Sequence, residues 1–145
     1  WVTLKDIQTL DAIFSDAFRK IVQNNRELHR QHIDQLASQV VRQIEQSYAD
    51  SDLSPTRIAD SLGMSSAYLG RIFRESMQTS ISQYLNQTRI RRAEELLRET
   101  EQPVETVAGL VGFSNPKYFY VVFKNITGQT PLQFRKAVHS ASEKN

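Results

Sequence analysis

The side chains best suited to chemistry in this sequence are cations and hydrogen-bond donors in two similar stretches, residues 58–73 and 107–123. In the first stretch, Arg71 carries a planar guanidinium that can donate two parallel hydrogen bonds to O6 and N7 of guanine. In the second stretch, Lys117 carries a compact ammonium that suits a phosphate oxygen. Both side chains favour recognition of a polar ligand over catalysis.

Patterns typical of catalysis or metal binding are missing from the sequence. With no Cys, thiol nucleophiles and cysteine-ligated zinc are excluded. His29 and His32 lie three residues apart without a third ligand, so we interpret them as solvated or packed residues and expect no metal and no cofactor. There is no glycine-rich phosphate loop and no nucleophile elbow. We therefore expect that the chain is not an enzyme.

The two stretches are copies of one pattern. Ala59, Gly63 and Phe73 in the first copy correspond to Ala108, Gly112 and Phe123 in the second. The offset is 49 residues at the glycines and 50 at the phenylalanines, because the second copy gains one residue. Such a repeat predicts the same structural unit built twice.

The first copy has the marks of a helix-turn-helix. Ser54 followed by Pro55 is typical of the start of a helix, and Gly63 favours a tight turn that ends it. Ser65 or Ser66 then caps a second helix. A second helix with polar residues near its N-terminus is the arrangement that fits the major groove of DNA.

The second copy repeats these signals. Gly112 occupies the turn, and Ser114 or Asn115 followed by Pro116 opens the next helix. Both copies are therefore predicted to end in a helix that presents its N-terminal half to a ligand.

Residues 80–99 between the copies are predicted to form one helix, which Ser80 and Gln83 open with a capping-box pattern. Its apolar residues cluster on two sides, Ile81, Tyr84, Leu85 and Thr88 on one and Ile90, Ala93 and Leu97 on the other. This change of direction predicts a helix that contacts two subdomains. Ion pairs one turn apart are expected on its exposed side: Arg91 with Glu95, and Glu94 with Arg98.

The first 54 residues contain neither Gly nor Pro, which predicts long helix. Apolar side chains follow a seven-residue repeat in the first part, with Asn24 in the same seam: Ile7, Leu10, Phe14, Ala17, Ile21 and Leu28. Two interpretations stay open, a parallel coiled coil that forms a homodimer with Asn24 fixing its register, or a helix packed on an upstream sensor domain. Later apolar residues predict a core helix of the domain that follows: Leu36, Val40, Val41, Ile44 and Tyr48.

The net charge of the chain does not indicate a class of partner, because 18 basic and 16 acidic residues leave a formal value of +2. By segment, the net charge is −1 over residues 1–50, 0 over 51–102 and +3 over 103–145. No run approaches 18 apolar residues, so we expect no membrane contact and a cytoplasmic location. Because the chain begins at Trp1 without Met, we expect it to be a fragment of a longer protein.

A series of motifs at fixed spacing runs through the second copy and beyond it: Val107-Ala108-Gly109-Leu110-Val111-Gly112-Phe113, Tyr118-Phe119, Phe123-Lys124, Gly128-Gln129-Thr130-Pro131 and Phe134-Arg135. In these residues the sequence resembles the DNA-binding domain of the AraC/XylS family of bacterial transcription regulators, from about Leu53 to Ala137. The resemblance implies an all-α fold of seven helices, contact of one monomer with two adjacent major grooves, and control of transcription through RNA polymerase. Gln78 stands where the family usually has glycine, and Val121 where it often has arginine.

The predicted contacts with DNA lie on the second helix of each unit and at helix starts. Base-reading candidates are Ser66, Ala67, Gly70, Arg71, Pro116, Lys117, Tyr120 and Val121. Phosphate-binding candidates are Ser54, Arg57, Ser65, Arg74, Ser114, Asn115 and Lys124. Arg71 is the main reader, because the second set has few bidentate donors and favours phosphate anchoring, apolar contact and shape. Tyr68 and Tyr118 are expected at the edges of the two cores.

We therefore predict an all-α protein with two helix-turn-helix subdomains joined by a long central helix and preceded by a long N-terminal helix. Residues 1–35 form a linker or coiled coil, and residues 36–145 a DNA-binding domain with units at about 54–76 and 103–125 and a connecting helix at about 80–99. The predicted function is sequence-specific binding of double-stranded DNA by a transcription regulator, an activator. The alternative is a helical protein-interaction or signalling module with a degenerate DNA surface.

Overall fold

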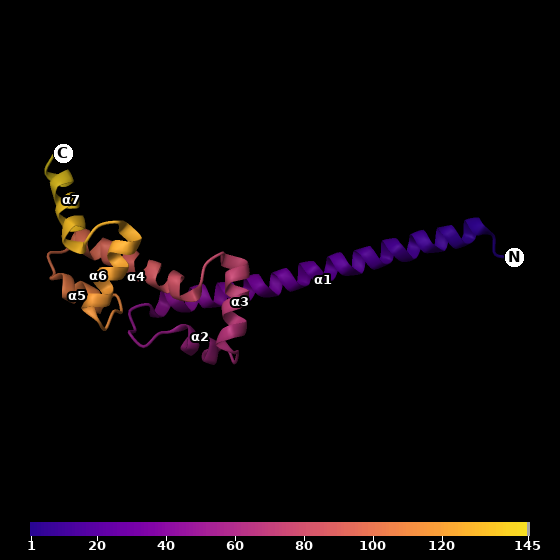
Figure 1. Ribbon diagram of the computed structural model, residues 1–145, viewed down its shortest axis with the longest axis horizontal. Coiled ribbons are helices and arrows are strands. Elements are labelled where there is room, and N and C mark those ends of the chain that lie inside the picture. The colour runs from indigo at the N-terminus through magenta and orange to yellow at the C-terminus, as the bar shows by residue number, and fades with distance from the viewer. Residues whose placement is uncertain (145) are drawn as a thin grey trace.

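The computed structural model describes residues 1–144, and within them it forms seven helices and no strand (Figure 1). The helices are α1 (Leu4–Ser47), α2 (Pro55–Ser61), α3 (Ser66–Met77), α4 (Ile81–Glu99), α5 (Val104–Leu110), α6 (Pro116–Thr127) and α7 (Pro131–Glu143). The predicted all-α fold is confirmed. Among the described residues, no helix combines the length and apolar character needed to cross a membrane.

The two helix-turn-helix units, α2–α3 and α5–α6, are built alike. Each pairs a helix of 7 residues with one of 12. The turns contain Gly63 (φ 67°) and Gly112 (φ 105°), in a backbone region that glycine adopts without a Cβ penalty. The residue after each glycine donates its amide to the alanine five positions earlier, Met64 to Ala59 and Phe113 to Ala108, both at 2.9 Å. The repeat seen in the sequence is therefore a repeat in space.

Each unit has its own apolar core, and α4 contributes to both. The first core contains residues of α1, α2, α3 and α4: Ala37, Val40, Ile44, Leu53, Ile58, Ala59, Leu69, Phe73, Ile81 and Leu85. The second contains residues from α4 to α6: Ile90, Ala93, Leu97, Val104, Val107, Ala108, Val111, Phe113, Phe119, Val122 and Phe123. The predicted change of face along α4 is thus confirmed, with the switch between Leu85 and Ile90.

The N-terminal helix has two parts that differ in burial but not in secondary structure. From Ile33 onward it packs on the first unit, as predicted for the apolar residues between Leu36 and Ile44. The preceding turns project away from the rest of the molecule (Figure 1). The division predicted between residues 35 and 36 falls inside this continuous helix, two residues after its first buried side chain. That division into domains stays a prediction.

The charged residues of α4 pair differently from the expectation of one-turn pairs. Arg91 donates to Glu45 of α1 at 2.9 Å, and Arg92 lies 3.7 Å from the same carboxylate. Within α4, the pair formed is Arg92 with Glu95, at 3.1 Å. The expected Arg91–Glu95 and Glu94–Arg98 pairs are absent from the described residues: Arg91 is taken by the carboxylate of α1, and Arg98 lies over the Phe134 ring at 5.7 Å. The ion pairs with Glu45 connect two helices.

Gln78 adopts a backbone conformation that normally selects glycine. It ends α3 at φ 59° and ψ 24°, and its amide bonds the Arg74 carbonyl at 3.0 Å. Gly128 does the same at the end of α6, with φ 79° and a 2.8 Å bond to Lys124. A side chain in this left-handed region costs about 1–2 kcal/mol. The glutamine in place of the family's usual glycine therefore leaves the turn intact. The cost of the left-handed conformation falls on Gln78 alone.

Replacing Gln78 by glycine should stabilise the protein. The expected gain is about 0.5–1 kcal/mol, because relief of the left-handed strain exceeds the loss of the Gln78 side-chain bond to the Glu75 carbonyl. For a chain of this size that raises the melting temperature by about 1–4 °C. Thermal unfolding followed by circular dichroism measures the change. Gly128→Ala is the matched control and should lower stability; a Gln78→Gly variant that melts below wild type would contradict the strain.

Candidate nucleic-acid interface

The outward face of α3 carries the residues predicted to read DNA. Ser65 caps the helix by accepting the Tyr68 amide at 3.2 Å, which settles the choice between two serines. The core takes Leu69, Ile72 and Phe73. The remaining positions form the opposite face, where Ser66, Ala67, Arg71 and Arg74 are exposed and Gly70 is half-buried. A Cβ at Gly70 would meet no neighbouring atom, so a ligand can come close to the backbone there.

Arg71 is oriented by an aromatic neighbour. Its guanidinium carbon lies 5.5 Å from the centre of the Tyr68 ring, one turn earlier on α3. The pair is a cation–π contact, worth about 0.5–1 kcal/mol at an exposed site. Within the described residues Arg71 has no carboxylate partner, so its donors are available to a ligand. Tyr68 is 39% exposed, which places it on this surface as well as at the core edge where it was predicted.

The outward face of α6 is less polar. Asn115 caps the helix by accepting the Lys117 amide at 3.0 Å. Pro116, Lys117 and Val121 are exposed, as is Lys124 two turns further on. Tyr120 instead packs half-buried against the second core, with its ring 6.1 Å from that of Phe119. Tyr120 is therefore less exposed than Lys117 and Val121, and its base-reading role stays a prediction.

Tyr118 occupies the place on α6 that Tyr68 occupies on α3. Half of its surface is exposed, and its ring lies 5.9 Å from that of Phe113. Its hydroxyl accepts a hydrogen bond from the Asn86 amide of α4 at 3.2 Å. From the sequence, both tyrosines are expected only at the edges of the two cores. Their equivalent places in the repeat, at the first turn of a helix with an open outer face, were the signal that could have shown them to be part of the surface.

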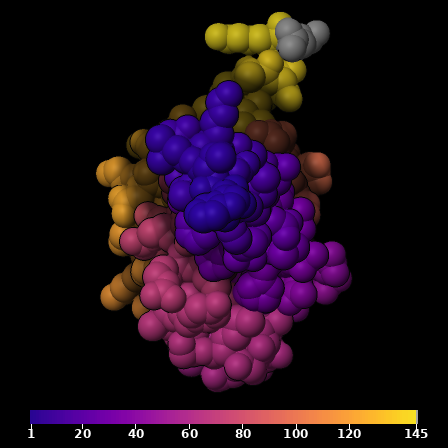
Figure 2. Space-filling model, turned by 90° about the vertical axis from the view of Figure 1, so that its right-hand side faces the viewer, coloured from indigo at the N-terminus to yellow at the C-terminus, as the bar shows by residue number. Residues whose placement is uncertain are grey.

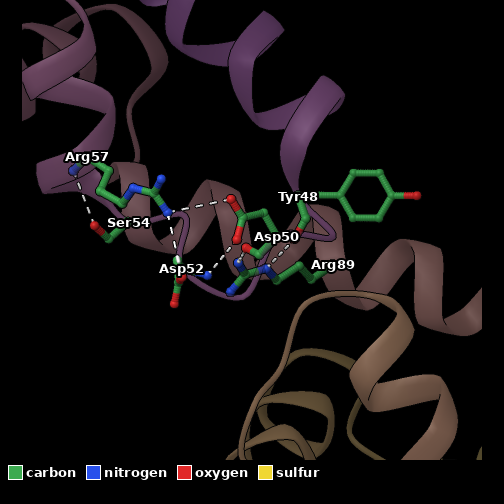
Figure 3. Close-up of polar contacts among 6 residues, drawn as sticks. All are labelled: Tyr48, Asp50, Asp52, Ser54, Arg57 and Arg89. Atoms are coloured by element: carbon green, nitrogen blue, oxygen red, sulfur yellow. Dashed lines mark hydrogen bonds and ion pairs between the residues drawn. The ribbon is translucent and has the colours of Figure 1, made fainter.

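The helix starts predicted to bind phosphate are only partly free. The Ser54 hydroxyl already accepts the Arg57 amide at 3.2 Å (Figure 3). The Arg57 guanidinium lies 3.5 Å from Asp50 and 4.0 Å from Asp52, so two carboxylates compete with any anion for it. Ser114 is exposed at the turn before α6. The second-unit equivalent of the Ser54 cap is Pro103, which offers α5 no side-chain hydrogen bond.

Arg89 of α4 joins the two units and was missed in the sequence. Its Nε donates to the Tyr48 carbonyl at 2.8 Å, and one terminal nitrogen donates to the Asp50 carbonyl at 2.9 Å (Figure 3). The guanidinium lies 5.5 Å from the centre of the Phe113 ring in the second unit. Burial lowers the pKa of Arg89 from its ordinary value, and the Asp50 carboxylate opposes the shift. An arginine placed where the apolar face of α4 changes side was the available signal.

Gly112 completes this junction from the other side. A Cβ on Gly112 would overlap the Tyr48 carbonyl oxygen and come within 2.8 Å of Arg89 Nε. The glycine is thus required twice, by its positive φ and by the close approach of the end of α1. The Gly63 turn of the first unit has no such neighbour. Arg89 and Gly112 therefore form a buried contact between the end of α1 and the second unit.

The comparisons with known proteins agree with this geometry. A helix-turn-helix domain family matches residues 58–137. The arabinose operon regulatory protein of Escherichia coli is 32% identical over 117 residues, which is 81% of this chain. The chain belongs to the AraC/XylS family of transcription regulators. The AraC/XylS resemblance found in the sequence is confirmed, and so is helix-turn-helix DNA binding as the activity of the family.

Two solved structures show the AraC-type architecture. The C-terminal domain of the response regulator AraT from Geobacillus stearothermophilus is 30% identical, with a TM-score of 0.69 over 70% of this chain and 84% of that one. The DNA-binding domain of the transcriptional factor AdpA, solved with a target DNA, has a TM-score of 0.69 at 24% identity and covers 75% of this chain and 97% of that one. Among curated relatives, the chain spans between 34% and 40% of the length of the arabinose regulator and two others.

Proposed function

We propose that this AraC-type domain binds double-stranded DNA sequence-specifically by placing α3 and α6 in two successive major grooves. The observation that carries the proposal is the fixed pairing of two matching helices through one buried junction, formed by Arg89 and Gly112. Each helix presents an open outer face while its other side is buried in a separate core. Such a pair favours one duplex with two contact points over two independent ligands.

The dimensions of the molecule support this reading. α4 has 19 residues and is about 28 Å long at 1.5 Å per residue. In Figure 1, α3 lies beside the beginning of α4 and α6 lies farther along it, where the Tyr118 hydroxyl of α6 accepts a hydrogen bond from Asn86 of α4. One turn of duplex DNA spans about 34 Å, so α4 is long enough to carry two helices that enter neighbouring grooves. The DNA-binding domain of AdpA, which shares the fold, was solved with a target DNA, and this supports DNA as the ligand.

The two recognition helices make different kinds of contact with the DNA. α3 offers the guanidinium of Arg71, held over Tyr68, for bidentate contact with guanine. α6 offers Lys117 for phosphate, and Val121 for an apolar contact such as a thymine methyl group. Sequence preference therefore comes mainly from the first unit, while the second unit anchors the domain.

The finer parts of the function are proposed on the resemblance alone. AraC/XylS regulators control transcription through RNA polymerase, and we extend this to the present chain as an activator acting in the bacterial cytoplasm. A transcription assay with purified RNA polymerase and a promoter that carries a selected site tests it. A rise in transcript when the protein is added is expected, and a fall would make the protein a repressor.

The two kinds of contact predict different losses for two substitutions. Arg71→Ala should cost about 1–3 kcal/mol on a selected site and little on random DNA, because it removes a base contact. Lys117→Ala should weaken both duplexes alike and reduce the salt slope by about 1, because it removes a phosphate contact. Gel-shift titration of both variants and wild type, on both duplexes and at two salt concentrations, measures these losses.

Two outcomes of that titration would contradict the proposal. An equal loss on specific and random DNA for Arg71→Ala would remove Arg71 as a base reader. Wild-type affinity that shows no sequence preference and does not fall with salt would favour the protein-interaction module instead.

The proposal includes a homodimer formed through the exposed half of α1, with a second copy in parallel as the partner. Its support is the seven-residue apolar repeat, which is exposed to solvent in the single chain: Phe14 and Ile21 are 71% and 59% exposed. Asn24 falls in the same seam, where a polar residue favours a parallel pair in one register. Large apolar side chains in a continuous stripe are rarely left uncovered in a stable protein.

Substitutions in the stripe should dissociate this dimer. The full chain is expected to sediment as a dimer, and the triple variant Ile7→Ser, Phe14→Ser and Ile21→Ser as a monomer, since the three side chains supply the apolar contacts of one seam. Gln8→Ser with Gln23→Ser is the matched control, because both lie off the seam on the same helix. A wild-type chain that sediments as a monomer at tens of micromolar would refute the homodimer and leave an upstream domain as the occupant.

A further inference from the structure

We propose that a row of three arginines on α1, Arg19, Arg26 and Arg30, binds the phosphate backbone of the DNA that flanks the first recognition helix. The inference rests on the proposed function, because it requires a duplex lying on α3 and α6. It extends the DNA-binding surface onto a helix that precedes both helix-turn-helix units.

The three arginines share one side of α1. At 3.6 residues per turn, their side chains project within about 40° of one another. All three are exposed, and none forms an ion pair within residues 1–144. Lys20, on another side of the same helix, is by contrast paired with Asp16 at 3.2 Å. The three arginines thus project from one side of α1, and none is paired with a carboxylate of residues 1–144.

This side of α1 continues the face that packs on the first unit. Ile33 and Ala37, which are buried, project in nearly the same direction as the arginines. A cleft of about 360 Å³ separates α1 from the end of α3, and its lining includes Arg26 and Arg30 as well as Glu75 and Ser76 of α3. Ser76 donates to Asp34 at 2.7 Å, which fixes the two helices at this crossing. The row therefore starts beside the C-terminal end of the recognition helix.

The path of the DNA follows from the position of the recognition helices. A duplex that receives α3 and α6 in successive major grooves runs along the line that joins them. In Figure 1 this line lies along the long axis of the molecule, and α1 continues that axis beyond α3. Figure 2 looks from the N-terminal end, where α1 projects toward the viewer and the first unit lies below it. DNA that extends past α3 therefore runs beside the exposed half of α1.

The length and chemistry of the row fit a phosphate backbone. From Arg19 to Arg30 the helix rises about 16 Å, which corresponds to about five base pairs at 3.4 Å each. Guanidinium groups bind phosphate oxygens in bidentate fashion. The apolar stripe points about 160° away from the row, so a second copy packed on the stripe would leave the row open. One helix can therefore carry a dimer contact and a DNA contact on opposite sides.

The test compares duplexes of two lengths. A selected site that ends at the α3 groove is titrated against the same site extended by ten base pairs on that side, with wild type, the variant Arg19→Gln/Arg26→Gln/Arg30→Gln, and the control Lys20→Gln/Arg42→Gln, which removes exposed cations from other sides of α1. Wild type and control should bind the longer duplex with a salt slope steeper by about 2–3, since three more phosphates are neutralised. That slope corresponds to an additional fall of about 40-fold in affinity between 50 and 200 mM salt. The triple variant should lose this difference and keep its affinity for the short duplex.

The outcomes separate this inference from the function on which it rests. An equal gain from the flanking DNA in wild type and the triple variant would overturn the arginine row while leaving recognition by α3 and α6 intact. A gain from DNA added on the α6 side instead would overturn it too. Failure of wild type to prefer the short selected duplex over random DNA would overturn the proposed function, and the inference with it. Circular dichroism of the triple variant confirms that these exposed substitutions leave the helices folded.

Discussion

The buried guanidinium of Arg89 is the interaction on which the placement of both recognition helices depends. A charged side chain removed from water is costly unless its donors are used, and here they meet the Tyr48 and Asp50 carbonyls at the end of α1. The C-terminal end of a helix carries unpaired carbonyls and a partial negative charge, so the end of α1 suits a cation. Phe113 covers the other side of the guanidinium, and Gly112 lets the second unit approach. A rotation of one unit against the other would break these hydrogen bonds and leave the buried charge without partners. We therefore expect the two units to move as one body.

A rigid arrangement of this kind explains how a DNA-binding domain can bind DNA while carrying little net charge. Residues 51–102 are neutral overall, and residues 103–145 carry only three positive charges in excess. A strong electrostatic field is therefore not the source of affinity. In the proposed binding mode, affinity depends on a few cations at fixed positions, where the cost of arranging them has been met by folding. Arg71 held over Tyr68 is one example, and Arg57, already engaged by two carboxylates, shows that some cations serve the fold instead.

Local signals in the sequence were enough to predict the helices and the turns between them. Caps such as Ser54 and Ser80, the glycines at both turns and the two apolar sides of residues 80–99 each act within a few residues, and the helices follow them closely. The junction could not be predicted in this way, because Arg89 finds its partners 41 and 39 residues earlier in the chain. The same holds for Glu45 of α1, which takes Arg91, expected to pair with Glu95 within α4. The half-buried position of Tyr120 was not predictable either, because helical periodicity alone does not show how far a core extends around a helix.

Dependence on the spacing between the two groove contacts tests the central claim most directly. One base pair is inserted between the two parts of a selected site, and binding is compared for wild type and Arg89→Met, with folding checked by circular dichroism. The insertion moves one contact by about 34° around the duplex, so a rigid wild-type domain should lose about tenfold or more in specific affinity. Arg89→Met, with its junction loosened, should lose distinctly less. Wild-type binding that tolerates the insertion would contradict the account, because it would mean that the two units move independently.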